Sequence, residues 1–388
     1  MLLTESHLKS ETLGECCRDI TLYNRDEIVW KRQSVASERE IGHEMYAIKN
    51  IPPYLKINFH SNKDWLSKKY PSVKGFAISL ENYTDINDYV RQQFKSKARS
   101  QLLRRIRRLE DCFNIRFKRY YGKIDGDTCF GLLASLKEMI IARFQERNQV
   151  SDNLKNWTQI QTTLYSLIIA KKASLFVIYN ENTPISISIC YHYGNVFFSY
   201  IDSYDIDYHK FSLGNILIYK KLELCFENGY KFLDMGWGEL DYKKRWCNHI
   251  YNFEHHIWLP KYSFSAYLLA TLEGYKTWIK AYLKSHKLGL LFDSMRNMLK
   301  TKKNEVKTVL EYHFENLENS ISQTDLVSLD LSNEEYLKFK AILNDFIYKT
   351  EEHFSNVKLY RLRNEEFYMI KGKSHCKKIF LKNSSSSS

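Results

Sequence analysis

The sequence lacks several features that would assign it to a familiar class. It contains no run approaching about 18 uninterrupted apolar residues, the length that a transmembrane helix needs. Residues 1–18 lack the basic-then-apolar pattern of a secretory signal. None of the eight cysteines forms a Cys-x-x-Cys pair, so no spacing supports a zinc site. We therefore expect reduced, mostly buried thiols, no bound metal and a cytoplasmic protein.

The composition is that of a folded protein with a basic surface. Hydrophobic residues make up 44% and aromatic residues 15% of the 388 residues, which excludes a disordered chain. This length predicts one to three domains. Lysine and arginine total 58 against 45 acidic residues, giving a formal net charge of +13. Such a charge favours phosphorylated cofactors, nucleic acid or an acidic membrane surface, and does not choose among them.

The clearest secondary-structure signals lie between Ser174 and Pro260. Residues 185–193 alternate apolar and polar side chains with a period of two, which predicts a strand with one buried face. The tight turn Gly194-Asn195 follows it. Three strands of an antiparallel meander are predicted first, at residues 174–179, 185–193 and 196–201. A loop at 203–211, a helix at about 212–229 and a fourth strand at 230–235 follow.

Before that stretch, a long helix is predicted to start near Thr84. Apolar residues recur at helical spacing on one face: Ile86, Val90, Phe94, Leu102, Ile106 and Leu109. The other face is basic, with no intervening acid: Arg91, Lys95, Lys97, Arg99, Arg104, Arg105, Arg107 and Arg108. This face is a solvated helix surface, a cradle for phosphates or a nucleic-acid contact. The scarcity of stacking aromatic residues among the basic ones disfavours nucleic acid.

After Pro260 the chain changes character. Residues 262–300 predict an amphipathic helix with lysines between its apolar residues, which either packs on its own domain, the favoured reading, or rests on an anionic membrane. A polar linker is expected at 301–330, a helix at 331–350 capped by Ser332, and a hairpin around Asn364. The serine tail, 384–388, is expected to be disordered.

The loop between the third strand and the helix has features of an anion site. A helix N-terminus presents backbone N–H groups to an anion, and Gly214 allows a ligand to approach the backbone closely. Ser212 is a candidate helix cap and Lys210 adds positive charge. We assign donor binding to His209, Lys210, Ser212, Leu213, Gly214 and Asn215. Capped helices near a glycine are common, so the loop alone does not define a site.

At this point the chain resembles the GNAT acyltransferase superfamily. In that family the same strand, loop and helix hold the pyrophosphate of coenzyme A through the pattern Arg/Gln-x-x-Gly-x-Gly/Ala. This sequence has His209, Ser212 and Gly214 at the marked positions, so two of the three depart from the pattern. The departure is similar to the cellulose-biosynthesis-type (CelD-like) and FemAB-like branch, in which an Asp-x-Gly motif and a Tyr/Phe-Lys pair follow.

Two later motifs match that branch. Asp234-Met-Gly236 and Tyr242-Lys243 stand one helix and one strand after the loop. The resemblance covers residues 174–260, extends more loosely over 84–171 through the basic helix, and does not cover 301–388.

The resemblance implies roles for particular residues. Acyl transfer to an amine needs a base for the amine, a donor to the thioester oxygen and an acid for the leaving thiolate. Asp202 is a candidate base or a strand-end turn residue. Tyr208 and Tyr242 are candidate thiolate acids or core residues. Asp234 and Lys243 fit substrate orientation and charge stabilisation, or a surface ion pair.

Histidines and cysteines offer other chemistry. His192 and His209 are further candidate bases, although a lone strand histidine is more often structural. No nucleophile stands beside a paired base. Direct attack on a bound thioester is therefore simpler than a covalent route through Cys190, Cys225 or Cys247.

We therefore predict an α/β (α+β) fold of tandem GNAT-like modules, with mixed, largely antiparallel sheets flanked by helices and a helical C-terminal extension. An unassigned segment is expected at residues 1–69, followed by a degenerate module with the basic helix at 70–172. The acyltransferase module is expected at 173–262 and a mainly helical extension at 263–388. The two modules are expected to share the work, the first helping to build the acceptor cleft and the second binding the donor.

The predicted reaction moves an acyl group from acyl-CoA, such as acetyl-CoA, or from an acyl carrier protein to an amine. The resemblance implies an amino sugar or another cell-envelope precursor as acceptor, and acyl-CoA is a cosubstrate rather than a permanently bound cofactor. In a FemAB-like alternative the donor is aminoacyl-tRNA and the basic helix faces the tRNA. Two further alternatives are a non-catalytic nucleic-acid-binding protein and a peripheral membrane protein that uses residues 262–300.

Overall fold

The computed structural model describes nine stretches of the chain: residues 17–22, 28–31, 45–59, 65–146, 152–285, 311–316, 326–329, 337–362 and 367–381. The chain divides into two compact units. Unit 1 contains residues 1–93, 190–200 and 222–303, and unit 2 contains residues 94–189, 201–221 and 304–388. Within the described stretches, no helix is both long and apolar enough to cross a membrane.

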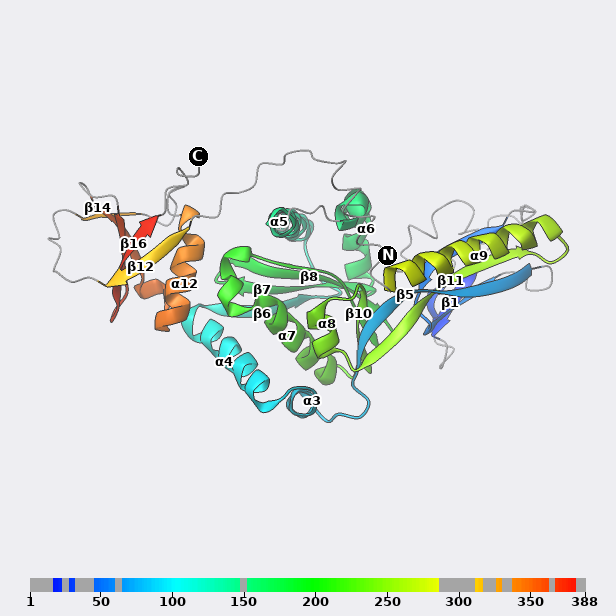
Figure 1. The fold of residues 1–388 in the computed structure, drawn as a ribbon, viewed down its shortest axis with the longest axis horizontal. Coiled ribbons are helices and arrows are strands. Elements are labelled where there is room, and N and C mark those ends of the chain that lie inside the picture. Colours follow the sequence, from blue (N-terminus) through cyan, green and yellow to red (C-terminus); the bar gives the residue numbers. More distant parts are fainter. Residues whose placement is uncertain are drawn as a thin grey trace. The chain divides into compact units, whose positions relative to one another are not determined.

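Three elements supply residues to both units. They are strands β8 (Thr183–Tyr193) and β9 (Val196–Tyr204) and helix α7 (Leu213–Glu227). Both units combine helices with sheets, which confirms the predicted α/β class (Figure 1).

Unit 1 is built on long antiparallel strands. Its other elements are β1 (Cys17–Leu22), β2 (Ile28–Lys31), β3 (Tyr46–Ile51), β4 (Leu55–Phe59), β5 (Trp65–Ser79), α3 (Ile86–Gln93), β10 (Phe232–Trp237), α8 (Asp241–Trp246), β11 (His249–Pro260) and α9 (Phe264–Ser285). The strand order is β3-β11-β5-β10-β9-β8, with a second sheet of order β2-β1-β4. Strands β9 and β10 pair in parallel, as expected when a helix connects them, whereas β5 pairs antiparallel with β10 and β11.

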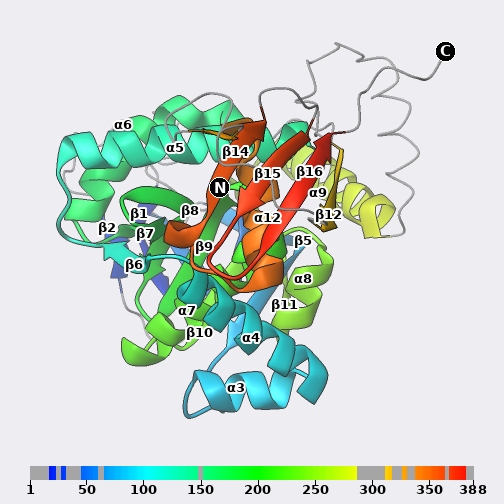
Figure 2. The same cartoon turned by 90° about the vertical axis from the view of Figure 1, so that its left-hand side faces the viewer.

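Unit 2 contains the basic helix and the C-terminal residues. Its elements are α4 (Ser96–Cys112), β6 (Ile115–Tyr120), α5 (Gly126–Gln145), α6 (Trp157–Ile169), β7 (Ala173–Asn180), α12 (Lys340–Thr350), β12 (Tyr312–Asn316), β13 (Leu326–Ser328), β14 (Lys358–Leu362), β15 (Phe367–Lys371) and β16 (Cys376–Leu381), with short 3₁₀ turns η1 (Asp152–Asn156), η2 (Ile206–Phe211) and η4 (Phe354–Asn356). Helices α5 and α6 cover one face of the sheet β9-β8-β7-β6, and α4 and α7 cover the other (Figures 1 and 2).

The predicted helix at 84–109 is two helices, which corrects the sequence reading. Helix α3 ends at Gln93 and α4 starts at Ser96, because Lys95 adopts an extended conformation with φ −60° and ψ 150°. The apolar spacing continues across this break, so periodicity alone could not reveal it. The predicted apolar residues are nevertheless buried, and all eight basic residues are exposed or half-buried.

Strand β8 is buried on both faces, not on one as the alternation predicted. Its apolar side chains from Ile185 to Tyr191 are buried, and so are Ser186 and Ser188. A serine face can be buried when its hydroxyls find partners. Here Ser186 donates to the carbonyl oxygen of Ser203 at 3.0 Å, and Ser188 bonds to Asp202.

The described residues after 263 contain strands as well as the predicted helices. Helix α9 forms as expected up to Ser285, and the 357–370 hairpin forms as β14 and β15. These two strands belong to a five-stranded antiparallel sheet of order β12-β16-β15-β14-β13, which the sequence reading missed (Figure 2). The Ser332 cap, most of the 301–330 linker and the serine tail lie outside the described residues.

Candidate functional site

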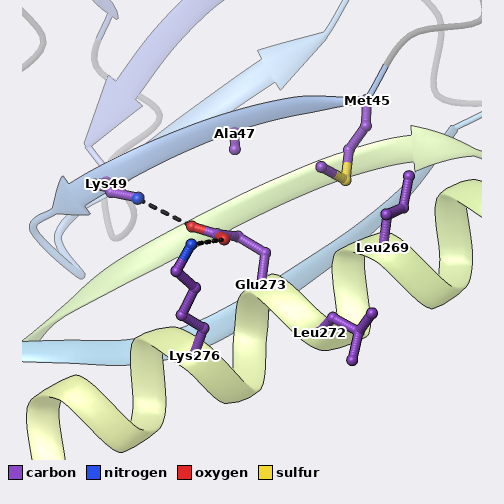
Figure 3. A pocket seen from close by; sticks show the side chains of 7 residues that line it. All are labelled: Met45, Ala47, Lys49, Leu269, Leu272, Glu273 and Lys276. Atoms are coloured by element: carbon purple, nitrogen blue, oxygen red, sulfur yellow. Dashed lines mark hydrogen bonds and ion pairs between the residues drawn. The ribbon is translucent and has the colours of Figure 1, made fainter.

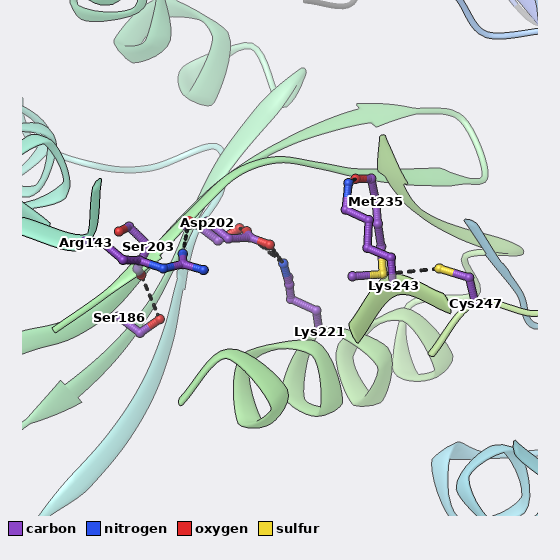
Figure 4. A network of polar contacts seen from close by, with 9 residues as sticks. Arg143, Ser186, Asp202, Ser203, Lys221, Met235, Lys243 and Cys247 are labelled. Atoms are coloured by element: carbon purple, nitrogen blue, oxygen red, sulfur yellow. Dashed lines mark hydrogen bonds and ion pairs between the residues drawn. The ribbon is translucent and has the colours of Figure 1, made fainter. Parts of the chain in front are cut away.

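A buried ion pair joins β9 to α7 within unit 2. Lys221 of α7 is completely buried, and its Nζ lies 2.9 Å from both carboxylate oxygens of Asp202, which is one-quarter exposed (Figure 4). Ser188 of β8 donates to the same carboxylate. A buried ammonium needs a counter-ion, and Asp202 supplies it. The structure thus gives Asp202 a partner that the sequence reading did not foresee.

The start of α7 rests against an aromatic ring. A Cβ added at Gly214 would lie 3.2 Å from Cε1 of Tyr204, so the glycine permits close approach of the ring to the helix. The guanidinium of Arg143 lies 4.3 Å from the centre of the ring of Tyr204, which is on β9. It also donates a hydrogen bond to the carbonyl oxygen of Asp202 on the same strand, at 3.2 Å. Arg143 of α5 therefore fixes the end of β9, where the turn to α7 begins.

The turn from β9 to α7 closes at Ser212 in a left-handed conformation, with φ 63° and ψ 46°. The amide N–H of Asn215 donates to the carbonyl oxygen of Ser212 at 2.9 Å, while the Asn215 side chain donates to the Ser212 hydroxyl at 2.8 Å. Ser212 therefore bonds a side-chain amide where a helix-capping hydroxyl was expected. His209 and Lys210 are exposed beside this turn.

A C-terminal helix packs on the same turn. Lys340 of α12 pairs with Asp205 at 2.6 Å, and Asn344 donates to the carbonyl oxygen of Asp207 at 3.0 Å. Lys210 lies 3.8 Å from a carboxylate oxygen of Asp345, which is also on α12. These contacts hold residues 205–210 of the turn against α12, a helix to which the sequence assigned no function.

The helix α12 is also attached to the basic helix α4. Arg108 pairs with Glu351 and lies 4.6 Å from the centre of the Tyr348 ring. One arginine of the basic face is thus used for internal packing. Arg104 and Arg107 are exposed members of that face, and Arg91, which is also exposed, pairs with Asp88 at 2.7 Å.

Tyr208, a candidate thiolate acid, is a core residue. It is 4% exposed, packs on Phe113 with 5.2 Å between ring centres, and its hydroxyl accepts from Asn180 at 3.2 Å. Burial raises its pKa above the usual value, which keeps the phenol protonated. These contacts account for Tyr208 by packing alone.

Asp234 anchors a second cluster, which lies in unit 1. It ends the parallel pairing of β10 with β9 and is completely buried. Tyr54 and Tyr251 donate to one of its oxygens at 2.6 and 2.5 Å, and the Gly236 N–H donates to the other at 2.7 Å. Burial raises the pKa of the Asp234 carboxyl, although hydrogen bonds from both tyrosines oppose the shift.

A glycine makes this cluster possible. Gly75 of β5 faces the ring of Tyr251, and a Cβ there would overlap the ring. The ring can therefore cross over β5 and place its hydroxyl against Asp234. Burial and the neighbouring carboxyl raise the pKa of both tyrosines, so each remains a hydrogen-bond donor.

Lys243 is buried close to the same cluster. It is 5% exposed, and its Nζ donates to the carbonyl oxygens of Met235 and Trp237 at 2.7 and 2.6 Å (Figure 4). The ammonium therefore ties helix α8 to the end of β10. The neighbouring Tyr242 is half-buried on α8. Neither Asp234 nor Lys243 is a surface residue, so the surface ion pair considered for them is wrong.

The remaining candidates have structural partners. His192 accepts or donates a hydrogen bond with the Tyr230 hydroxyl at 2.9 Å, as expected of a structural histidine. Cys190, Cys225 and Cys247 are buried. Burial raises the pKa of the Cys247 thiol to about 12, which opposes formation of a nucleophilic thiolate.

The predicted residues thus form two groups, one in each unit. Asp202, Tyr208 and the 209–215 turn lie in unit 2, and Asp234, Tyr242 and Lys243 lie in unit 1. Sequence reasoning missed Lys221, although a lysine within the apolar helical run 216–226 was a signal that could have found it. Tyr54 is 180 positions from Asp234 and carried no local signal.

Comparison with known proteins places part of this structure in a family. The mixed sheets and flanking helices define an α/β protein, and residues 96–244 match the model of the acetyltransferase (GNAT) domain family. This segment is similar to a GNAT-type acetyltransferase domain. The match covers the basic helix α4, the 209–215 turn, Asp234 and Lys243. It runs through residues 172–173, where the sequence reading placed a boundary between two modules.

Solved structures share only a distant likeness. One is a conserved protein of unknown function from Bacteroides thetaiotaomicron, with 9% identity, a TM-score of 0.35 and coverage of 52% of this chain and 64% of that one. FemX is 11% identical, with a TM-score of 0.36 and coverage of 47% of this chain and 61% of that one. L-PGS from Bacillus licheniformis is 12% identical, with a TM-score of 0.32 and coverage of 54% of this chain and 68% of that one. The chain thus spans less than two thirds of the first two structures. No curated protein matches it.

Proposed function

We propose that this protein is an N-acyltransferase that moves an acyl group from acyl-CoA, or from an acyl carrier protein, to an amine acceptor. The observation that carries the proposal is the GNAT family match of residues 96–244. Within that range, the turn from β9 to α7 is the segment that the family resemblance connects with the donor's pyrophosphate. An amino sugar or another cell-envelope precursor is the acceptor that the resemblance implies.

The geometry of the turn supports donor binding there. The N-terminus of α7, a helix of 15 residues, places the N–H groups of Leu213 and Gly214 at this turn, whereas the Asn215 N–H is bonded to the Ser212 carbonyl oxygen. His209 and Lys210 are exposed beside it, and Lys210 carries a positive charge toward which phosphates are attracted. The contacts of α12 hold the preceding residues in place, which reduces the ordering that binding would require.

The reaction needs no covalent enzyme intermediate. The amine nitrogen attacks the thioester carbonyl carbon, the C–S bond breaks, and the thiolate takes up the proton that the amine releases. The buried, high-pKa thiol of Cys247 is consistent with direct transfer. The Asp234 cluster and Lys243 hold the end of β10, and we assign them a positioning role.

A titration of the protein with acetyl-CoA tests the donor site. Gly214→Asp places a carboxylate at the start of α7, and we expect it to weaken binding at least about tenfold. Gly214→Ala is the matched control, because it adds the same Cβ against Tyr204 without the charge. Equal affinities of the Asp and Ala variants would refute the assignment of the turn.

A second donor has one observation in its favour. The exposed basic residues of α4, including Arg104 and Arg107, favour a polyanion, and aminoacyl-tRNA is the donor that the FemAB-like resemblance implies. The same titration with aminoacyl-tRNA, and with Arg104→Glu/Arg107→Glu, distinguishes the donors. If the wild type binds no acyl-CoA, acyl carrier protein or aminoacyl-tRNA, the transferase proposal is wrong. Sequence-independent nucleic-acid binding that maps to α4 would favour the non-catalytic alternative.

A further inference from the structure

Helix α9 packs on unit 1 through its smallest residues. Ala266 and Ala270 are buried against Ile257 and Leu259 of β11. Gly274 completes this face at the same spacing of four residues, and a Cβ there would overlap the ring of Tyr70. The helix therefore lies close to β5 and β11 (Figure 1).

Polar contacts fix the helix along the same side. Lys68 of β5 donates to the Thr271 hydroxyl at 2.8 Å, and His255 of β11 bonds to the Thr277 hydroxyl at 2.8 Å. Glu273 pairs with Lys49 of β3 at 3.0 Å. These contacts attach α9 to unit 1 over most of the length whose side chains are described.

The large apolar side chains of α9 point away from this packing. In an ordinary amphipathic surface helix the large apolar residues face the core and the polar residues face water. Here the arrangement is reversed, and six large side chains are each more than half exposed: Phe264, Leu268, Leu269, Leu272, Tyr275 and Trp278. At 100° per residue, they lie on one continuous side of the helix. We call these six residues the outer face of α9.

A depression of about 490 Å³ adjoins this surface between α9 and β3 (Figure 3). Its lining is mixed, with the apolar Met45, Ala47, Leu269 and Leu272 and the charged Lys49, Glu273 and Lys276. A group of large apolar side chains exposed side by side is a candidate contact with another molecule or with a membrane. The mixture of aliphatic side chains with tyrosine and tryptophan is typical of helices at a lipid interface.

The charges near the outer face are basic. Glu273 is the only acidic residue of α9, and it is neutralised by Lys49 at 3.0 Å and Lys276 at 3.7 Å. Residues 261–285 contain four lysines and one acidic residue. A second copy of this chain would bring the same positive charges against one another, which disfavours self-association through this face. An anionic lipid surface complements both the charge and the apolar side chains.

We propose that the outer face of α9 docks on an anionic lipid bilayer. In this arrangement the helix lies parallel to the membrane plane, the six side chains enter the boundary between headgroups and acyl chains, and the lysines contact the lipid headgroups. The helix packs on its own domain, as the sequence favoured, but it does so through Ala266, Ala270 and Gly274 rather than through its large apolar residues.

Co-sedimentation with lipid vesicles tests this proposal on the full chain. Vesicles of equal parts phosphatidylglycerol and phosphatidylcholine should bind the wild type, and vesicles of phosphatidylcholine alone should bind it far less. Leu268→Glu/Leu272→Glu should lower the affinity by roughly tenfold or more, since each leucine loses the gain from leaving water. Both leucines are exposed, so the variant should fold.

Phe130→Glu is the matched control. Phe130 is exposed to a similar extent on α5, in unit 2, and its replacement should leave vesicle binding unchanged. Three outcomes would overturn the proposal: no binding of the wild type to anionic vesicles, equal binding to both kinds of vesicle, or equal binding of the wild type and the α9 variant. Sedimentation velocity without lipid distinguishes the rival occupant, because a dimer that the α9 variant disrupts would assign the outer face to a second copy of the chain.

Discussion

The ion pair of Asp202 with Lys221 makes a prediction that separates a structural role for Asp202 from a catalytic one. The two partners differ in burial, because the Lys221 side chain has no exposure while that of Asp202 is one-quarter exposed. Removing either charge leaves the other without its partner. The cost should therefore depend on which charge is left behind.

Asp202→Asn leaves an ammonium that has no access to water. Removing one partner of a buried pair costs about 3–5 kcal/mol, and complete burial of Lys221 places this variant in that range. Lys221→Met instead leaves a carboxylate that reaches solvent and keeps the bond from Ser188. We expect this variant to lose about 1–3 kcal/mol. The double variant should lose less than the sum of the two, because neither charge remains.

Urea unfolding followed by circular dichroism measures these differences, and hydrogen exchange of β8 and the first half of α7 assigns them to unit 2. Transfer activity is measured on the same preparations. The reasoning is refuted if Lys221→Met is the more destabilised single variant, or if Asp202→Asn abolishes transfer with no loss of stability. The second result would identify Asp202 as the catalytic base.

Three further predictions concern unit 1. The pKa of Asp234 is raised in the folded state, so its contribution to stability is complete below about pH 3.9, the pKa of an unfolded aspartate, and is lost as pH rises through the folded pKa. The difference in unfolding free energy between wild type and Asp234→Asn should therefore shrink from pH 4 to pH 8. A difference that grows would contradict the burial of this carboxyl. Gly75→Ala should destabilise the protein by about 1–3 kcal/mol in thermal unfolding, because the new Cβ overlaps the ring of Tyr251. The same substitution should destabilise the Tyr251→Ala variant much less. Equal losses of stability in both backgrounds would show that the overlap is relieved elsewhere. Lys243→Ala should lower turnover more than acetyl-CoA affinity, because the buried ammonium holds the end of β10 and is assigned no contact with the donor. Steady-state kinetics with a parallel binding titration measures both effects. Unchanged turnover would remove Lys243 from the site.

The local pattern of the sequence predicted much of the fold. Strands β7 to β10 and helix α7 form where the residue patterns predicted them, although β8 is buried on both faces. The break at Lys95 was missed because one backbone torsion changes while the apolar spacing continues. The C-terminal sheet was missed because its strands are short and amphipathic, and their pairing depends on partners far apart in the chain.

The candidate site was predictable only where a motif carried it. The Asp-x-Gly and Tyr-Lys motifs led to Asp234 and Lys243, but not to their burial or to the tyrosine hydroxyls around Asp234. Those hydroxyls come from β11 and from a turn near residue 54, and long-range packing alone brings them together. Likewise, nothing near Lys210 indicated that Asp345 would be its neighbour. Pairings of this kind depend on the tertiary fold and leave no local signature.

The central claim is that an acyl donor binds at the turn between β9 and α7. Hydrogen–deuterium exchange of the wild type, with and without saturating acetyl-CoA, tests it directly, because a phosphate on the first N–H groups of a helix slows their exchange. The account predicts slower exchange in peptides that cover residues 209–217, and loss of that protection in Gly214→Asp but not in Gly214→Ala. Protection confined to other segments, or no protection at a donor concentration that saturates binding, would contradict it.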